Sequence, residues 1–272
     1  MVLTNVCLSK YATYLGMATP YRVHEQPDEF KVDNLFAQIA QAGYDVKDCI
    51  TPNLYETLRN ILEKYQDSPE YSYLSQLILK TMKRAKYSEF NLGHYALKEP
   101  YYSHFTSPIR RFPDLILHHQ VHTIFDKTYP HNTLSNKTVE EMCEHASYME
   151  RAADESEKEA DNYTILQYMS KHKEKFYPGY IKELTSDGIL VMTNAGISGT
   201  IPYENYDEPL TIDLKNQKAY YQKHLLLKVG NACLLKVQNI DFARNTVKFN
   251  LEKNLSIRTE GKDYTRTLKK VN

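Results

Sequence analysis

The chain has 272 residues, of which 42% are hydrophobic, and its formal net charge at pH 7 is zero. This length allows one large domain or two small ones, and the lack of an apolar run of about 18 residues excludes a membrane span. The first residues show neither a basic region nor a small-residue cleavage site, so we expect no signal peptide. None of the four cysteines belongs to a CxxC pair, which argues against a structural zinc site and favours reduced thiols in a cytoplasmic protein.

Charge is divided unevenly along the chain. Residues 176–272 carry 14 Lys/Arg and 10 Asp/Glu, a net of +4, whereas residues 1–175 carry 20 and 24, a net of −4. A zero total does not by itself indicate a nucleic-acid binder, but a basic C-terminal part favours an anionic partner for that part.

Four helices are predicted within the first 85 residues, because apolar side chains recur there at helical spacing. They cover residues 2–15, residues 28–42, a segment that opens at Thr51-Pro52, and residues 71–85. The first helix is expected to bury one face, which consists of Leu3, Val6, Cys7, Tyr11 and Tyr14. The fourth helix carries or adjoins a basic cluster, for which a solvated face is the simplest interpretation: Lys80, Lys83, Arg84 and Lys86.

A short strand is predicted at residues 93–97, and it leads to the most informative stretch of the chain. In residues 101–115, two prolines fix a turn and a helix start around the adjacent Arg110 and Arg111. A rigid pair of guanidinium groups matches the bidentate geometry of a phosphate. Solvated charge or a structural ion pair is the alternative interpretation of the same two residues.

A long helix is predicted from the capping-box pattern Thr138-Val-Glu-Glu141 to about residue 173. Glu157 falls on the apolar side of this helix, where a carboxylate is costly unless it has a partner. A slight drift of the apolar stripe would instead leave Glu157 at the edge of a dense acidic run. The expected inward stripe is Val139, Met142, Ala146, Met149 and Ala153.

After Phe176 the apolar period changes from helical to alternating, which predicts five strands separated by short turns. Five short strands in fewer than 80 residues favour a small barrel. The segment from residue 254 to the end is polar and basic, which is typical of a flexible tail. The predicted strands are residues 180–184, 189–192, 199–201, 232–240 and 246–251.

Three motifs resemble the ribonuclease II / ribonuclease R family of processive 3′-to-5′ exoribonucleases. They are Tyr21-Arg-Val-His-Glu25, Tyr87-Ser-Glu-Phe-Asn-Leu-Gly-His94 and His104-Phe-Thr-Ser-Pro-Ile-Arg-Arg-Phe-Pro-Asp114, and they occur in the order that the family has. The run Ser-Pro-Ile-Arg-Arg and its spacing to the predicted barrel resemble the ribonuclease R branch in particular.

The resemblance implies an α+β fold in two parts. Residues 1–175 are expected to form the mostly helical C-terminal half of an RNB-type catalytic domain. Residues 176–253 are expected to form a five-stranded antiparallel OB-fold barrel of the S-one type, which binds RNA, and residues 254–272 a flexible basic tail. The basic cluster near the fourth helix then has a second interpretation, as the wall of an RNA channel.

The resemblance also implies roles for individual residues. Arg110 matches the family's catalytic arginine, which contacts the phosphate at the scissile bond, and Glu157 matches the late glutamate that helps to gather the RNA end. The other motif positions implied to shape or line the RNA channel are Arg22, His24, His94, His104, Ser107 and Arg111. On the barrel, the expected RNA-binding residues are Tyr203, Lys236 and Lys248, although each tyrosine of this region is equally well read as an ordinary rim residue.

Hydrolysis of single-stranded RNA to nucleoside 5′-monophosphates in this family uses Mg²⁺ held by several neighbouring aspartates. The sequence has no Asp-Asp pair, and the closest aspartates, Asp45 and Asp48, flank a loop. We therefore expect no metal ligands in this chain, and expect the Mg²⁺ of the complete enzyme to be held by a part that is missing here.

Three hypotheses follow. The chain is part of an exoribonuclease whose metal-binding half comes from elsewhere, such as a separate chain; it is an RNA-binding module without catalysis; or it is a decayed fragment that folds poorly. None of the three predicts a membrane partner.

Overall fold

The computed structural model describes residues 1–206, 209–221 and 224–256. The chain forms two compact units, and each is built from two separate stretches of sequence. Unit 1 comprises residues 1–28 and 82–158, and unit 2 comprises residues 29–81 and 159–272. The predicted boundary between a catalytic part and a barrel domain at residue 175 stays a prediction. Most of the predicted tail, residues 254–272, lies outside the described residues. No described helix is long and apolar enough to cross a membrane.

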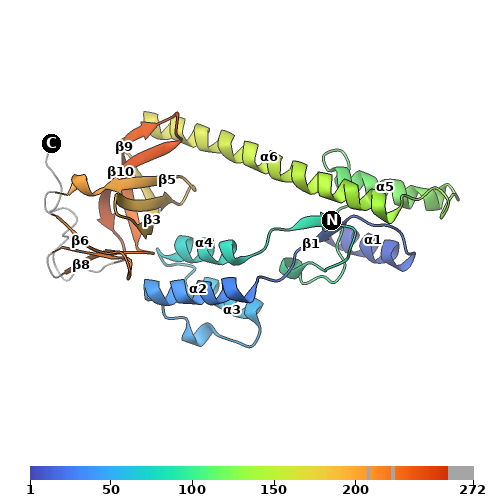
Figure 1. Cartoon of the computed structure of the whole chain (residues 1–272), viewed down its shortest axis with the longest axis horizontal. Helices are drawn as coiled ribbons and strands as arrows, with labels where there is room; N and C mark the ends of the chain where they lie inside the picture. Colours follow the sequence, from blue (N-terminus) through green and yellow to red (C-terminus); the bar gives the residue numbers. More distant parts are fainter. Residues whose placement is uncertain (207–208, 222–223, 257–272) are drawn as a thin grey trace. The chain divides into compact units, whose positions relative to one another are not determined.

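Unit 1 holds a helical core around a two-stranded sheet (Figure 1). Strands β1 (Tyr21–Val23) and β2 (Lys86–Ser88) pair antiparallel. Its helices are α1 (Val2–Tyr14), α5 (Phe112–Phe125) and the first part of the 36-residue α6 (Asn136–Lys171). The buried side chains between these elements include Tyr87, Ile116, Val139 and Cys143 in one cluster, and Ala12, Met17, Leu117 and Val121 in another.

The bounds predicted for the first helix are close to those of α1, but of its predicted inward face only Val6 is buried. Tyr14 is 86% exposed and Leu3 is also exposed, whereas the buried residues are Asn5, Val6, Ser9 and Ala12. This polar face is buried because tertiary contacts satisfy it. The Asn5 amide donates to the Tyr102 hydroxyl at 3.1 Å and accepts from the Phe105 backbone N–H at 3.1 Å.

Two further local predictions are wrong. Residues 93–97 do not form a strand; Tyr95–Leu97 is a single 3₁₀ turn, η2, capped by His94, whose Nδ1 accepts from the Leu97 N–H at 3.3 Å. The long helix begins two residues before the predicted capping box. The Ser135 hydroxyl accepts from the Thr138 N–H at 3.1 Å, so Ser135 caps α6 and Thr138 lies in its first turn.

Unit 2 packs three helices and the last part of α6 with a five-stranded closed barrel. The helices are α2 (Glu29–Ala42), α3 (Leu54–Lys64) and α4 (Tyr71–Thr81), with a 3₁₀ turn, η1 (Lys47–Cys49), between the first two. The Asn53 side chain caps α3, and so this helix begins just after the predicted Thr51-Pro52 opening. The apolar stripes predicted for these three helices supply much of their buried surface: Leu35, Ile39, Leu58, Ile61, Leu74, Leu77 and Ile78.

The barrel confirms the five predicted strands. In barrel order they are β10 (Thr246–Asn254), β5 (Ser198–Pro202), β4 (Gly188–Thr193), β3 (Phe176–Leu184) and β9 (Ala232–Asp241). The pairing of β10 with β5 is parallel and closes the barrel, whereas the other pairings are antiparallel as predicted. Alternate side chains fill the interior, among them Ile181, Ile189, Leu235 and Phe249.

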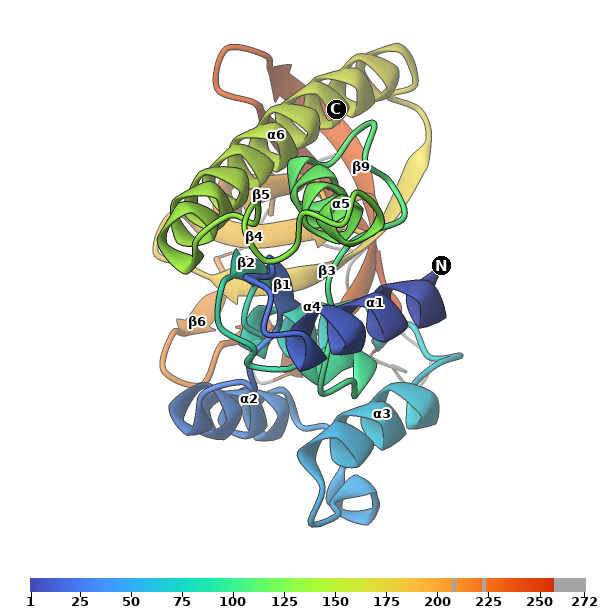
Figure 2. The same cartoon turned by 90° about the vertical axis from the view of Figure 1, so that its right-hand side faces the viewer.

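A small sheet between β5 and β9 was not predicted from the sequence. It consists of β6 (Thr211–Asp213), β7 (Lys218–Tyr221) and β8 (His224–Lys228), and it follows the 3₁₀ turn η3 (Tyr203–Asn205). Figures 1 and 2 both show the end of α2 beside this sheet, where the Gln41 amide donates to the Lys215 carbonyl at 3.1 Å. The Tyr44 hydroxyl donates to the Gly230 carbonyl at 2.7 Å. These bonds join α2 and Tyr44, just beyond its end, to the small sheet and to the turn before β9.

Candidate functional site

The start of α5 is clamped by one buried carboxylate. Asp114 has no exposed surface, and it accepts hydrogen bonds from the backbone N–H of Ser107 at 2.7 Å and from Arg111 Nε and Nη2 at 2.9 and 2.8 Å. Arg111 is the N-cap residue of the helix, and Pro113 lies in the first turn, where its missing N–H costs nothing. Because three bonds converge on Asp114, the loop from Ser107 to Arg111 is fixed to the helix.

The two adjacent arginines therefore differ. Arg111 forms a bidentate ion pair with Asp114, as in the alternative interpretation of these arginines as structural. Arg110 is exposed, and within the described residues it has no ion pair. A guanidinium group with five donors on a fixed turn, and no partner to displace, is suited to receive an anion.

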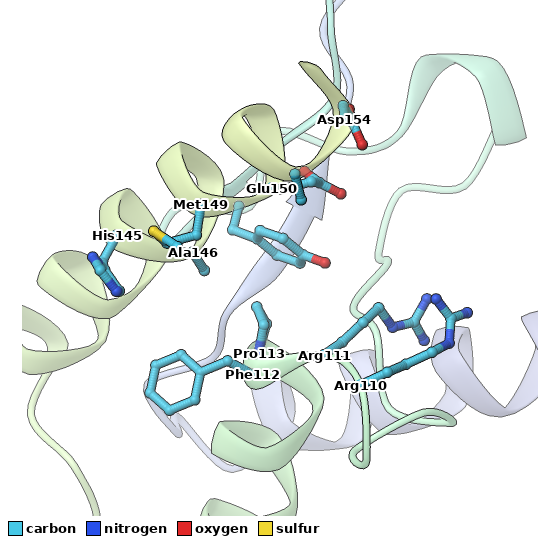
Figure 3. A pocket seen from close by; sticks show the side chains of 11 residues that line it. Arg110, Arg111, Phe112, Pro113, His145, Ala146, Met149, Glu150 and Asp154 are labelled. Atoms are coloured by element: carbon cyan, nitrogen blue, oxygen red, sulfur yellow. The ribbon is translucent and has the colours of Figure 1, made fainter. Parts of the chain in front are cut away.

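Arg110 borders a cleft of about 610 Å³ within unit 1, and α6 forms the opposite wall (Figure 3). Arg110, Arg111 and Phe112 line one side. The α6 side includes the two carboxylates Glu150 and Asp154, one turn apart, together with His145, Ala146, Met149 and Ala153. The cleft thus combines one available cation with a mixed apolar and acidic wall.

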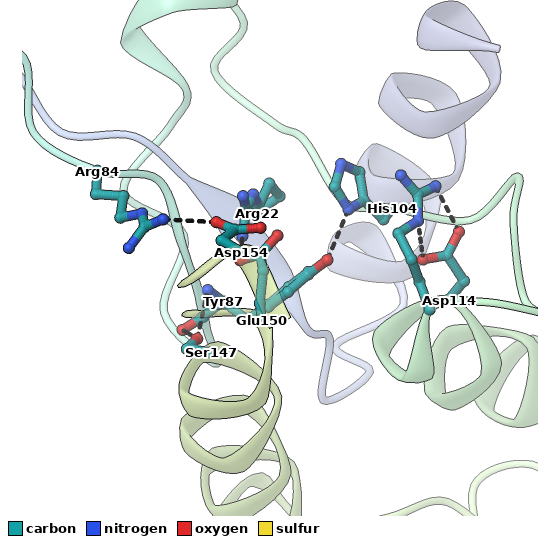
Figure 4. A network of polar contacts seen from close by, with 9 residues as sticks. Arg22, Arg84, Tyr87, His104, Asp114, Ser147, Glu150 and Asp154 are labelled. Atoms are coloured by element: carbon teal, nitrogen blue, oxygen red, sulfur yellow. Dashed lines mark hydrogen bonds and ion pairs between the residues drawn. The ribbon is translucent and has the colours of Figure 1, made fainter. Parts of the chain in front are cut away.

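Both carboxylates on that wall already have cationic partners. Arg22 on β1 pairs with Glu150 at 2.6 Å, and Arg84 pairs with Asp154 at 2.5 Å (Figure 4). The Arg22 guanidinium also lies 4.7 Å from the centre of the Tyr87 ring. Arg22, Arg84 and Arg111 are each paired with a carboxylate, whereas Arg110 has no ion pair to any described residue, which singles it out as the anion-binding group.

A cluster of histidine and tyrosine rings lies behind the arginine turn. His94 and His104 both contact the Tyr102 ring, with centroids 5.2 and 5.7 Å away, and the Tyr87 hydroxyl is 2.9 Å from His104 Nδ1. Burial, with Arg111 and Arg22 nearby, lowers the pKa of His104 to about 4. Burial, with His24 and Arg22 nearby, lowers the pKa of His94 to about 4. At neutral pH both rings are therefore uncharged and do not compete with Arg110 for an anion.

The structure brings together in unit 1 the residues that the motifs singled out there, although most of them make internal contacts. His24 Nε2 is 2.6 Å from the Lys83 carbonyl, and Ser107 contributes its backbone to the Asp114 clamp. Glu157 is exposed and does not line the cleft. It lies three residues beyond Asp154, on the same helical face, so its functional role stays a prediction.

Three residues that shape the site were missed by the sequence analysis. Asp114 could have been found from its spacing, since it follows Arg111 by three residues at a helix start. Glu150 and Asp154 share a helical face, but their partners Arg22 and Arg84 lie 128 and 70 residues away along the chain. No local pattern indicates those two pairs.

The barrel residues expected to bind RNA lie in unit 2. The Tyr203 hydroxyl donates to the Thr185 carbonyl at 2.7 Å, and its ring packs against the barrel core, as expected for a rim residue. Lys236 on β9 is half-buried and Lys248 on β10 is exposed. Both alternate with buried apolar residues along their strands, which directs both lysines outward. Their role in RNA binding stays a prediction.

The residues described here do not fit a magnesium site of the kind that the resemblance implies. No group of three His, Cys, Asp or Glu side chains among them is placed to hold a metal ion. Asp45 accepts from the Lys47 backbone N–H at 3.2 Å, and Asp48 lies 3.8 Å from the Lys64 ammonium, so these two aspartates serve local structure.

Residues 1–127, which include β1 and the arginine turn, match the RNB domain.

Over most of its length the chain is similar to ribonuclease R. It is 28% identical to ribonuclease R 1 of Lactococcus lactis over 258 residues, covering 92% of this chain and 31% of that protein. It is 37% identical to ribonuclease R of Aquifex aeolicus over 197 residues, covering 70% of this chain and 27% of that protein. The chain thus spans about a third or less of these curated relatives. In fold it matches Mycoplasma genitalium RNase R in complex with ribose methylated single-stranded RNA, with a TM-score of 0.73 and 24% identity over 92% of this chain and 40% of that one.

Proposed function

We propose that the chain forms part of a ribonuclease R-like 3′-to-5′ exoribonuclease, which releases nucleoside 5′-monophosphates from single-stranded RNA. The observation that carries this proposal is the unpaired guanidinium of Arg110, held by a clamped turn at the edge of a cleft, within residues that match the RNB domain. The likeness to a ribonuclease R solved with single-stranded RNA supports RNA as the ligand.

In this proposal Arg110 contacts the phosphate at the scissile bond and stabilises the charge that develops on its oxygens. The Asp114 clamp holds the turn, so the backbone that carries Arg110 need not be ordered at the moment of reaction. Glu157, one turn beyond the cleft wall, contacts the 3′-terminal nucleotide. The uncharged His94 and His104 line the channel with the neighbouring Tyr102 and leave the phosphate to Arg110.

The family's chemistry calls for divalent metal, and the described residues do not supply a carboxylate cluster to hold it. We propose that the metal-binding aspartates belong to sequence beyond these residues or to a separate chain. Apolar side chains beside the cleft support such a contact: Ile109 is fully exposed, Phe112 is 46% exposed and Met149 is 50% exposed. Buried aliphatic partners from the rest of the enzyme would cover them.

The second candidate is an RNA-binding module without catalysis. The lack of a carboxylate cluster among the described residues favours it. In both candidates the barrel binds the incoming strand, with Tyr203 offering a ring and Lys236 and Lys248 contacting phosphates. In both, the protein is cytoplasmic, in keeping with its four free cysteines.

One experiment distinguishes the two candidates. The purified chain is titrated with fluorescent single-stranded RNA, and mononucleotide release is followed by chromatography with Mg²⁺ present, first alone and then with the aspartate-bearing part of a ribonuclease R. Release only in the second mixture is the result expected for a part of an exoribonuclease. Binding without release in either mixture supports the RNA-binding module, and no binding at all refutes both candidates.

A matched pair of variants tests the barrel. Lys236→Gln combined with Lys248→Gln should weaken RNA binding and make the slope of log affinity against log salt shallower by up to about 1.4, since each phosphate contact on a single strand contributes about 0.7. The control is Lys171→Gln with Lys173→Gln at the end of α6, which removes the same charge. Equal losses in both pairs would show a general charge effect rather than a barrel site.

A further inference from the structure

A second groove, of about 440 Å³, lies within unit 2, between the helices and the barrel. Side chains of α2 and α4 form one wall, and β3 with the loop before β7 forms the other. Tyr73 and Tyr180 meet edge to face at its base, with ring centroids 5.5 Å apart, and both are buried. This contact fixes the helices against the barrel, so the groove has a firm floor.

Two lysines face this groove without partners. Lys80 of α4 and Lys182 of β3 both line it, and neither has an ion pair within the part of the chain that the structure describes. Burial and the charge of Lys182 lower the pKa of Lys80, while Glu183, which also lines the groove, acts in the opposite direction. The groove therefore holds two like charges whose mutual repulsion an anion would relieve.

Four glutamine side chains line the groove, and two of them already make hydrogen bonds within the structure. The Gln41 amide donates to the Lys215 carbonyl, and the Gln217 side chain bonds the backbone of Leu184. Gln38 and Gln76 line the groove as well, and among the described residues they have no hydrogen-bond partner. Each presents one acceptor and two donors, the complement that a base edge or a ribose hydroxyl requires.

We propose that this groove binds one nucleotide unit, with its phosphate between Lys80 and Lys182 and its base or ribose against Gln38 and Gln76. Two lysines match the charge of a phosphate, and the amides and Glu183 match hydroxyl and base N–H groups. A volume of 440 Å³ lies in the range of small-molecule sites, about 300–1,000 Å³. The unit comes either from a free mononucleotide or from an RNA strand, since both present the same phosphate and ribose.

This site is separate from the arginine turn and does not rest on exoribonuclease activity. None of its lining residues belongs to unit 1, whereas Arg110 and its cleft do. Arg110→Gln should therefore leave binding at the groove unchanged, which keeps failure of this proposal distinguishable from failure of the proposed function.

The test measures binding of uridine 5′-monophosphate, inorganic phosphate and a short labelled oligouridylate to the full chain. Lys80→Gln with Lys182→Gln should weaken nucleotide binding by at least about tenfold per lysine, as expected for a hydrogen bond to a charged group. Lys31→Gln, on α2 but outside the groove, is the single-charge control. Gln38→Ala with Gln76→Ala should weaken uridine monophosphate binding and leave inorganic phosphate binding unchanged.

Weaker binding of both uridine monophosphate and oligouridylate in the lysine variant supports a site that accepts free nucleotides. Weaker oligouridylate binding alone, with no mononucleotide binding by the unaltered chain, supports a site for one unit of a strand. No binding of either probe, or equal affinity in the lysine variant and the control, overturns the proposal. Inorganic phosphate binding as tight as that of the nucleotide also overturns it.

A second measurement needs no variant and so does not depend on the folding of one. The unaltered chain is acetylated with and without uridine monophosphate or oligouridylate, and the modified lysines are identified by mass spectrometry. Protection of Lys80 and Lys182, with Lys31 unchanged, is the expected result. Acetylation of both groove lysines at the same rate with and without these probes overturns the proposal.

Discussion

Replacing Asp114 with alanine should strongly destabilise unit 1, because it removes the buried carboxylate that holds the arginine turn. The carboxylate has no exposed surface and accepts three hydrogen bonds, two of them from Arg111, whose side chain is only 20% exposed. Asp114→Ala leaves a half-desolvated guanidinium without its counter-charge and the Ser107 N–H without an acceptor. Removing one member of a buried ion pair costs about 3–5 kcal/mol.

We expect the lower end of that range, about 3 kcal/mol, because the remaining exposure of Arg111 lets water solvate part of the charge. For a protein of this size, such a loss lowers the melting temperature by about 6–12 °C. The assay is thermal and urea denaturation followed by circular dichroism. Asp126→Ala is the matched control, since Asp126 is an exposed carboxylate at the end of the same helix.

The control should change the free energy of unfolding by no more than about 0.5 kcal/mol. Arg111→Ala combined with Asp114→Ala should cost less than the sum of the two single changes, because the double variant leaves no unpaired charge. A cost for Asp114→Ala within about 1 kcal/mol of the control would refute the inference that this carboxylate fixes the turn.

Two other predictions concern the histidine cluster and the barrel. The pKa of His104 is lowered to about 4, so between that value and 6.5 the unfolded chain binds a proton that the folded chain does not. The free energy of unfolding should therefore fall as pH drops through this window, by at most about 3 kcal/mol. His104→Gln should make the melting temperature less dependent on pH across the same window. Gly199→Ala would place a Cβ 2.4 Å from the Val247 carbonyl and 2.5 Å from the Phe249 ring, so it should cost about 1–3 kcal/mol in denaturation. An unchanged pH profile or an unchanged melt would contradict the respective prediction.

The spacing of apolar residues along the sequence predicted most of the fold. The helices and the five barrel strands have strong apolar patterns, and their predicted positions are confirmed. The sheet of β6, β7 and β8 was missed because its strands are short, with only Ala219, Leu226 and Leu227 fully buried among them. The buried face of α1 was missed because Asn5 and Ser9 are buried by distant hydrogen bonds, which override the hydrophobic pattern.

The site was predicted by sequence to the level of the motif and no further. The motif placed Arg110 beside Arg111 on a fixed turn, but it did not show which guanidinium forms a structural ion pair. That distinction depends on the depth at which Asp114 is buried. Similarly, Glu157 was favoured by the resemblance, since spacing alone left its position open. Glu150 and Asp154 line the cleft instead, and their partners Arg22 and Arg84 come from distant parts of the chain.

The most direct test of the account is the rate at which mononucleotides are released when Arg110→Ala replaces the native chain in a mixture completed with the aspartate-bearing part of a ribonuclease R. If Arg110 stabilises charge on the phosphoryl oxygens, the rate at saturating RNA should fall by about 10²–10³-fold, while RNA affinity stays close to that of the control Arg151→Ala. Arg151 is an exposed arginine of α6 that does not line the cleft. A rate equal to that of the control, or equal losses of rate and affinity, would contradict the role assigned to Arg110.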